Sequence, residues 1–151
     1  MQIRSFGNKD ASDVKHLIQS ILQQEFHTAR AAYPDTDLDH IQEIYGGKRE
    51  HFFVAEENGK LVGTCAIKEE SKHEALLRRL FVNPNFRKLG IGSTLIDQAC
   101  TFARGQGYQK LIFRSTSSMV QANQLLIKKG FKELERLAIG PTQIIRFTLN
   151  L

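Results

Sequence analysis

The stretch Arg87–Ser93, which reads Arg-Lys-Leu-Gly-Ile-Gly-Ser, combines two glycines with two cations in a pattern suited to binding phosphate. Gly90 and Gly92 have no side chain, so an anion can approach the backbone closely at these positions. A helical pattern begins within the stretch, and the first turn of a helix offers unpartnered N–H groups and partial positive charge. Arg87 and Lys88 add positive charge at the rim. The stretch therefore predicts a phosphate or pyrophosphate cradle, although such a loop can also serve only to begin a helix.

Two better-known glycine motifs do not fit these residues. The P-loop requires Gly-Lys-Ser/Thr at a fixed spacing, and this spacing is not present after Gly92. The dinucleotide-binding fingerprint requires a third glycine or alanine further on, which the stretch does not supply.

Apolar runs and turn residues place the cradle between a strand and a helix. The run Leu76–Val82 is typical of a strand, and the turn Asn83-Pro84-Asn85 follows it. A helix then presents one apolar face and ends at Gly105-Gln106-Gly107; the residues on that face are Ile91, Leu95, Ala99 and Phe102. Leu111–Ser115 is a further strand, so the order predicts a right-handed parallel crossover. In open α/β sheets, ligands bind at the C-terminal edge of such strands.

The rest of the chain alternates between strand and helix patterns. Asp10 is a plausible N-cap for the first helix, and Asn58-Gly59 is a strong hairpin signal. The other predicted strands are Gln2–Phe6, Phe52–Ala55, Leu61–Lys68, Phe131–Ile139 and Gln143–Leu149, and the other helices cover Val14–Phe26, about Asp37–Tyr45, and Met119 to Gly130. We expect one α/β domain over residues 1–151, with a mixed and mostly antiparallel sheet.

Composition limits the partners. The 151 residues carry a net charge of +5, which suits an anionic ligand. The basic residues are spread out and no nucleic-acid motif is present, which argues against nucleic acid as the partner. No apolar run approaches the ~20 residues of a membrane span, and Met1–Arg4 does not begin a signal peptide, so we expect a cytoplasmic protein that does not bind membranes. Cys65 and Cys100 lie in apolar patterns without zinc spacing, so we expect buried thiols and no metal.

Two blocks of this chain resemble motifs of the GNAT superfamily of N-acetyltransferases. Leu80–Pro84 followed by Arg87–Gly92 is similar to the family's acyl-CoA-binding motif, Arg/Gln-x-x-Gly-x-Gly/Ala after a strand that ends in Val. Ala122-x-x-Leu125, with Gly130-Phe131 after it, is similar to a later motif of the family. The order of the predicted elements also matches the family across nearly the whole chain.

The resemblance implies a fold of about seven strands and four helices, with the fourth and fifth strands splayed apart. It implies that the pantetheine arm of acetyl-CoA enters the splay and pairs with the backbone of Leu80, Phe81 and Val82. It also implies that the backbone N–H groups of the cradle hold the pyrophosphate; the cradle residues are Arg87, Lys88, Leu89, Gly90, Ile91, Gly92 and Ser93. Asn123 could contact the cofactor as helix residues do in this family, or lie exposed on its helix.

Three positions depart from the family pattern. Leu76 stands where the family often has a glutamate, and Met119 stands where it often has an asparagine. Leu126 stands where it often has the tyrosine that protonates the leaving thiolate. A general acid typically contributes ~10²–10⁴-fold, so this loss changes the mechanism more than the type of reaction.

The implied reaction moves the acetyl group of acetyl-CoA to a primary amine, on a small molecule, a peptide N-terminus or a lysine. The backbone N–H of Val82 is the candidate for stabilising the oxyanion. Glu74 lies two residues before Leu76 on the same strand face, roughly 6.6 Å away, and could take the amine proton through a water, or be only a solvated carboxylate.

Other residues remain as alternatives. Glu25 is the next candidate base, His73 adjoins a turn, and Ser115 and Ser117 could hold a water or cap a helix. Phe26, Tyr33 and Tyr45 could shape an acceptor pocket or simply pack in the core. The absence of the usual acid and base also leaves open a CoA-binding regulatory domain that has little or no activity. The sequence does not identify the acceptor or the oligomeric state, and a homodimer is one of the alternatives.

Overall fold

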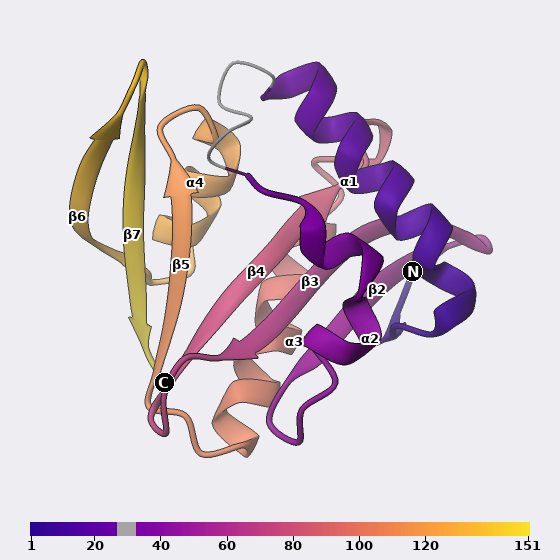
Figure 1. Cartoon of the computed structure of the whole chain (residues 1–151), viewed down its shortest axis with the longest axis horizontal. Coiled ribbons are helices and arrows are strands. Elements are labelled where there is room, and N and C mark those ends of the chain that lie inside the picture. Colours follow the sequence, from indigo (N-terminus) through magenta and orange to yellow (C-terminus); the bar gives the residue numbers. More distant parts are fainter. Residues whose placement is uncertain (27–32) are drawn as a thin grey trace.

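The computed structural model describes residues 1–26 and 33–151, which form a mixed sheet between two layers of helices (Figure 1). The strands in these residues are β1 (Gln2–Ser5), β2 (His51–Glu57), β3 (Lys60–Glu69), β4 (Glu74–Val82), β5 (Lys110–Thr116), β6 (Lys132–Ile139) and β7 (Thr142–Asn150). The α-helices there are α1 (Ala11–Glu25), α2 (Ile41–Ile44), α3 (Ile91–Gly105) and α4 (Val120–Lys128). The predicted α/β class is confirmed, and each predicted strand lies within one or two residues of an observed one.

The strand order is β1-β2-β3-β4-β5-β7-β6, and the central pair β4–β5 is parallel while the other neighbours are antiparallel. The register of β4 with β5 runs only from Glu74 opposite Lys110 to Leu77 opposite Phe113. Both strands continue beyond this last pair, to Val82 and Thr116, but they no longer pair with each other. The two strands therefore separate toward their C-terminal ends, as Figure 1 shows, and the predicted splay is confirmed.

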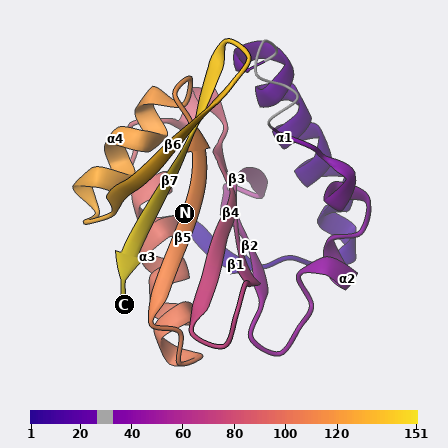
Figure 2. The same ribbon diagram turned by 60° about the vertical axis from the view of Figure 1, so that its left-hand side comes forward.

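Each face of the sheet is covered by its own apolar cluster. Figure 2 shows α3 and α4 on one side of the sheet and α1 and α2 on the other. On the α3 side, Leu95, Ile96 and Phe147 are fully buried, and on the α1 side Ile18 and Leu22 are. The two layers pack the central strands from both faces, and β4 and β5 separate only toward their C-terminal ends. No helix in the described part of the chain is long and apolar enough to cross a membrane.

Two local predictions differ in detail from the structure. Asp10 precedes α1, but its carboxylate does not cap that helix. It instead accepts hydrogen bonds from Arg4 Nη1 at 2.8 Å, Arg4 Nη2 at 2.9 Å and the amide of Gly7 at 2.9 Å. Hydrogen bonds to a charged guanidinium group are stronger than those to neutral amides, so Arg4 and the Gly7 amide stabilise this carboxylate more than the start of α1 would.

The predicted helix at Asp37–Tyr45 is broken into two short pieces. A 3₁₀ turn covers Thr36–Asp39 and α2 follows at Ile41–Ile44, with His40 at φ −139° between them. The break leaves the carboxylate of Asp37 directed into the protein, where it is bound by Arg79.

Candidate active site

A β-bulge bends β4 at the point where it leaves β5. The register passes from Ala66 opposite Arg78 to Thr64 opposite Phe81, so Arg79 and Leu80 together face the single residue Cys65. Arg79 has a φ of +54°, and its carbonyl oxygen accepts a hydrogen bond from Thr64 Oγ1 at 2.7 Å. Bulges bend and twist a strand, so this one turns the end of β4 away from β5.

On one side of the splay lies a groove of about 950 Å³ between β4, α4 and the loop that leads into α3. Its walls include most of the residues predicted to hold a cofactor; these are Leu80, Phe81, Val82, Arg87, Lys88, Gly90, Ile91, Gly92 and Ser93. Leu89 is the exception in the loop, since it does not line the groove and is 68% exposed. The end of β4 and the first turn of α3 therefore border the same groove.

The loop presents a row of free backbone amides to this groove. Thr94 is the first residue of α3 whose amide bonds within the helix, to the carbonyl oxygen of Gly90 at 3.0 Å. Among the described residues, the amides of residues 88–93 have no acceptor. Gly90 begins the helix at φ +82°, a conformation that favours glycine. A side chain at Gly92 would begin 3.1 Å from Leu125 of α4, so glycine there allows α4 to close one wall.

The backbone of Val82 also points into the splay. Asn83 donates its amide hydrogen to the carbonyl oxygen of Val62 at 2.8 Å, and antiparallel partners alternate between bonded and non-bonded pairs. Val82, opposite Gly63, therefore turns its N–H and C=O away from β3. The carbonyl oxygen accepts Arg87 Nε at 3.1 Å. The N–H of Val82 is left directed toward the gap, which is the orientation that stabilising an oxyanion requires.

Two of the candidate residues contact one another at the mouth of the groove. Arg87 Nη1 and Nη2 donate to Glu25 Oε1 and Oε2 at 2.7 and 2.9 Å, a two-bond pair that joins the end of α1 to the loop. Glu25, the alternative base, therefore balances the charge of Arg87, one of the cations predicted to lie beside the phosphate ligand.

A second cavity, of about 350 Å³, lies between the diverging ends of β4 and β5. It shares Leu80, Phe81 and Met119 with the larger groove, so the two spaces meet at the splay. Polar groups of its wall come from both strands and from the segment before α2; they include Tyr33, Arg78, Arg79, Arg114, Ser115 and Thr116. Among the described residues that line it, none carries a carboxylate.

One of these arginines is already neutralised. Arg79 Nε donates to Asp37 Oδ2 at 2.9 Å, and its Nη2 donates to the carbonyl oxygen of Pro34 and to Asp37. Tyr45 donates its hydroxyl hydrogen to the same carboxylate. Burial alone would raise the pKa of Asp37, but the hydrogen bonds from Arg79 and Tyr45 outweigh it and hold the pKa below its usual value. This buried network ties the segment before α2 to the bulge.

Hydrogen bonds at the end of β5 fix the opposite wall. Tyr33 and Thr116 share a hydroxyl–hydroxyl hydrogen bond, and burial raises the pKa of the Tyr33 phenol. Ser115 Oγ donates to Asn123 Oδ1, and Asn123 Nδ2 donates to the carbonyl oxygen of Thr116 at 2.9 Å. Both ends of the Asn123 amide are therefore used to hold α4 against β5. Asn123, predicted to contact the cofactor, does not line the groove.

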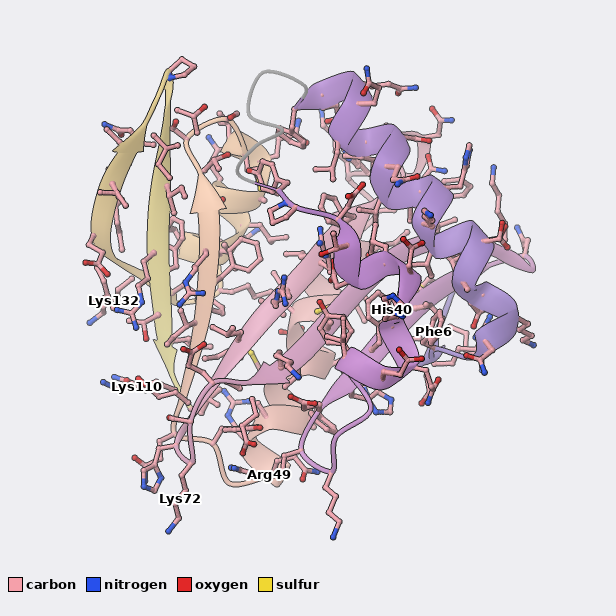
Figure 3. The ribbon with its side chains drawn as sticks, in the orientation of Figure 1. Phe6, His40, Arg49, Lys72, Lys110 and Lys132 are labelled. Carbon is pink, nitrogen blue, oxygen red and sulfur yellow. The ribbon has the colours of Figure 1, made fainter. Side chains whose placement is uncertain are left out.

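The structure does not bring Glu74 to either cavity. Glu74 is the first residue of β4 and stands opposite Lys110, at the closed end of the β4–β5 pair; Figure 3 labels Lys110 at this end. Val82 is eight residues further along the strand, which corresponds to about 26 Å. A single water cannot bridge that distance. Leu126, at the position of the family tyrosine, lies fully buried in the core beside α3 and lines neither cavity.

Sequence reasoning did not single out Arg78 and Arg114, which line the smaller cavity. A signal for both was present, because each interrupts an otherwise apolar strand: Leu-Leu-Arg-Arg-Leu in β4 and Leu-Ile-Phe-Arg in β5. Charged residues in the middle of a central strand need either a partner or a ligand.

A mixed sheet whose central parallel pair opens beside an amide-lined loop is the architecture of the acyl-CoA-dependent N-acetyltransferases. The model of the acetyltransferase (GNAT) family matches residues 16–131, and the chain belongs to this family. The recognition made from the Arg87–Ser93 and Ala122–Phe131 motifs is thereby confirmed.

Individual relatives show the same similarity. The chain is 30% identical to a probable N-acetyltransferase, camello, of Xenopus tropicalis over 130 residues, 84% of this chain and 59% of that protein. It is 31% identical to N-acetylaspartate synthetase of Xenopus tropicalis over 101 residues, 66% of this chain and 37% of that one. The chain thus spans less than two thirds of the length of these curated relatives. A ribosomal-protein-alanine N-acetyltransferase from Brucella melitensis superposes with a TM-score of 0.84 at 21% identity over 100% of both chains, which shows the shared fold.

Proposed function

We propose that this protein transfers the acetyl group of acetyl-CoA to a primary amine, with the donor in the larger groove and the acceptor in the smaller cavity. The observation that carries the proposal is the row of free amides at residues 88–93, at the mouth of a groove that meets a second cavity at the splay. One space suits a phosphate-bearing thioester, and the other gives an amine access to its carbonyl group.

The donor would bind along three features of the groove. The amides of residues 88–93 and the N-terminus of α3 hold the pyrophosphate. Lys88 and Lys128, both exposed at the rim, add positive charge. The pantetheine arm lies along Leu80 and Val82, whose backbone groups face the gap. In this pose the thioester would lie where the two cavities meet.

The chemistry then proceeds by direct attack. The amine nitrogen forms a bond to the acetyl carbonyl carbon, and the N–H of Val82 stabilises the oxyanion. The carbon–sulfur bond breaks, its electron pair stays on sulfur, and the amine proton passes to water. A thiol has a pKa of about 8.5, so the thiolate can leave without a side-chain acid.

Deprotonation of the amine does not require a nearby carboxylate in this site. The smaller cavity is lined by arginines, and like charges disfavour the ammonium form of a bound amine. We therefore leave Glu74 out of the proposed mechanism because of its distance from Val82, and we keep Glu25 only as a partner of Arg87.

The test is an acetyl-CoA turnover assay over a panel of amines, read as thiol release, together with calorimetry of acetyl-CoA binding. We expect micromolar to millimolar binding and thiol release that depends on an amine. Tight binding without release for any amine would instead support the regulatory domain considered from the sequence. The relatives are named for different acceptors, aspartate in one and a protein alanine in another, so family membership does not choose the acceptor. A cytoplasmic location and a homodimer stay predictions from the sequence.

A further inference from the structure

Three arginines form a row across neighbouring strands beside the smaller cavity. Leu77 and Phe113 are the last register pair of β4 and β5 and belong to the core on the α3 side. Successive strand residues alternate between faces, so Arg78 and Arg114 both follow on the opposite face. Arg146 of β7 stands directly opposite Arg114 and shares that face.

The bulge adds a fourth guanidinium group to the same region. Without it, Arg78 and Arg79 would point to opposite faces of β4. The extra residue lets Arg79 reach Asp37 while Arg78 lies toward Tyr45, with its guanidinium carbon 5.8 Å from the ring centre. Both side chains therefore point to the α1 and α2 side of the sheet.

The positive charge of this row is only partly compensated. Arg79 is paired with Asp37, and Arg146 Nη1 lies 3.3 Å from Glu135 Oε1 while its buried Nε has no hydrogen-bond partner among the described residues. Arg78 and Arg114 have no carboxylate within 4.0 Å in the part of the chain that the structure describes. Like charges on facing strand positions repel one another, and a negative ligand bound beside the row would offset this repulsion.

Arg78 and Arg114, which form no ion pair among the described residues, both line the smaller cavity, together with the paired Arg79. A polyamine or a lysine in a basic peptide would bring further positive charge into this space. An anionic group near the amine would instead gain charge-assisted hydrogen bonds, for which the planar guanidinium is well suited.

We propose that the acceptor is a primary amine that also carries a carboxylate or a similar anionic group, bound by Arg78 and Arg114. This inference rests on the proposed acetyl transfer, whose acceptor site it describes. A free amino acid and a peptide that begins with an acidic residue both supply this chemistry. The cavity of about 350 Å³ limits the part that enters to roughly one residue.

The substrates for the test come in matched sets. Initial rates with saturating acetyl-CoA are measured for free aspartate and glutamate, for their diamides, for spermidine, and for short peptides with Asp or Glu at the N-terminus. We expect kcat/KM for the anionic amines to exceed that of the diamides and spermidine by about tenfold or more. The comparison of free amino acids with peptides distinguishes the two sources.

The variants are Arg78→Gln and Arg114→Gln, with Arg104→Gln on α3 as the control arginine outside both cavities. We expect each cavity variant to raise KM for the anionic amine about tenfold, to change KM for the diamide by much less, and to keep wild-type acetyl-CoA binding. The control should leave both values unchanged. Retained acetyl-CoA binding also shows that the variants fold.

The outcomes separate this inference from the proposed function. Acetyl-CoA binding without transfer to any amine in the panel overturns the proposed function and this inference with it. Transfer to diamides or spermidine as fast as to the anionic amines overturns this inference alone. The same holds if both arginine variants leave the anionic preference unchanged.

Discussion

At the scale of single residues, Ser93 offers a sharp test of the anion cradle. Ser93 lies in the first turn of α3, lines the larger groove, and has a free amide. An aspartate there would favour the helix by about 0.3–1 kcal/mol, because a negative charge suits a helix N-terminus. The same charge would face the pyrophosphate, so Ser93→Asp should weaken acetyl-CoA binding by about tenfold or more while thermal stability stays equal or rises. Calorimetry and thermal unfolding measure the two effects.

The neutral variant Ser93→Asn is the matched control for Ser93→Asp. It should bind acetyl-CoA within about threefold of wild type, since the charge and not the side-chain size opposes the ligand. If Ser93→Asp bound acetyl-CoA as tightly as Ser93→Asn, the pyrophosphate would not lie at this helix end.

The pair between Glu25 and Arg87 gives a second residue-scale prediction. The pair is partly exposed, with 30% and 26% of the side chains accessible, so its net value is about 0–1 kcal/mol. Glu25→Gln frees Arg87 for the pyrophosphate, and acetyl-CoA should bind up to about fivefold more tightly with kcat unchanged. Equilibrium binding and steady-state kinetics measure this, with the exposed Glu70→Gln as control. A hundredfold loss of kcat would instead identify Glu25 as the base.

The sequence predicted the loop with its glycine at the helix start, but not the surroundings of Glu74 or the partner of Arg79, for physical reasons. The loop is a local feature: its glycines and the amides beside them are neighbours in the chain. Glu74 was placed by strand-face periodicity, which gives the face of a strand but not the distance along it from the splay. The positive charge of Arg79 is balanced by Asp37, which is 42 residues away, and no local pattern pairs these two residues.

At the scale of elements, the bulge in β4 and the segment before α2 depend on one buried ion pair. Asp37→Asn would leave the buried Arg79 charged without its carboxylate, and losing one partner of such a pair costs about 3–5 kcal/mol. Urea unfolding at neutral pH should show this loss. Asp39→Asn is the control, because its pair with Lys15 is exposed to solvent and contributes little to stability. A loss for Asp37→Asn no larger than the control would mean that the network does not hold the bulge.

The same pair predicts how stability depends on pH. The folded-state pKa of Asp37 lies below its ordinary value, so the unfolded chain binds the proton more readily. The contribution of Asp37 is therefore complete well above pH ~3.9 and is lost as the pH falls through the lower folded-state pKa. Unfolding free energies measured from pH 6 downward should fall less steeply for Asp37→Asn than for the wild type. If the unfolding free energy fell equally steeply with pH in both proteins, Asp37 would not be the group responsible for this pH dependence.

The elements themselves could be predicted because hydrophobic periodicity and glycine positions are short-range signals. The bulge could not, because Arg-Arg in β4 is compatible with an unbroken strand until the register with β3 is known. For the same reason the row of Arg78, Arg114 and Arg146 emerges only from the pairing of three strands. Elements were predictable, but the site depends on how the strands pair.

At the scale of the whole molecule, the two cavities meet at one point, where they share Leu80, Phe81 and Met119. The larger groove lies beside α3 and α4, and the smaller cavity extends to the segment before α2. In the proposed function, donor and acceptor therefore occupy the protein together, and the reacting atoms meet near Leu80 and Phe81, which line both cavities.

This arrangement predicts direct transfer in a ternary complex. Cys65 and Cys100 are both buried in the core, line neither cavity, and have thiol pKa values that burial raises. Neither can act as an acetyl carrier, so initial rates with both substrates varied should give intersecting double-reciprocal lines, and Cys100→Ala should keep wild-type turnover. Mixing the protein with labelled acetyl-CoA alone should leave no label on the chain. Parallel lines together with a labelled protein would show a covalent intermediate, and the acetyl group would then pass through a residue of the chain before it reaches the amine.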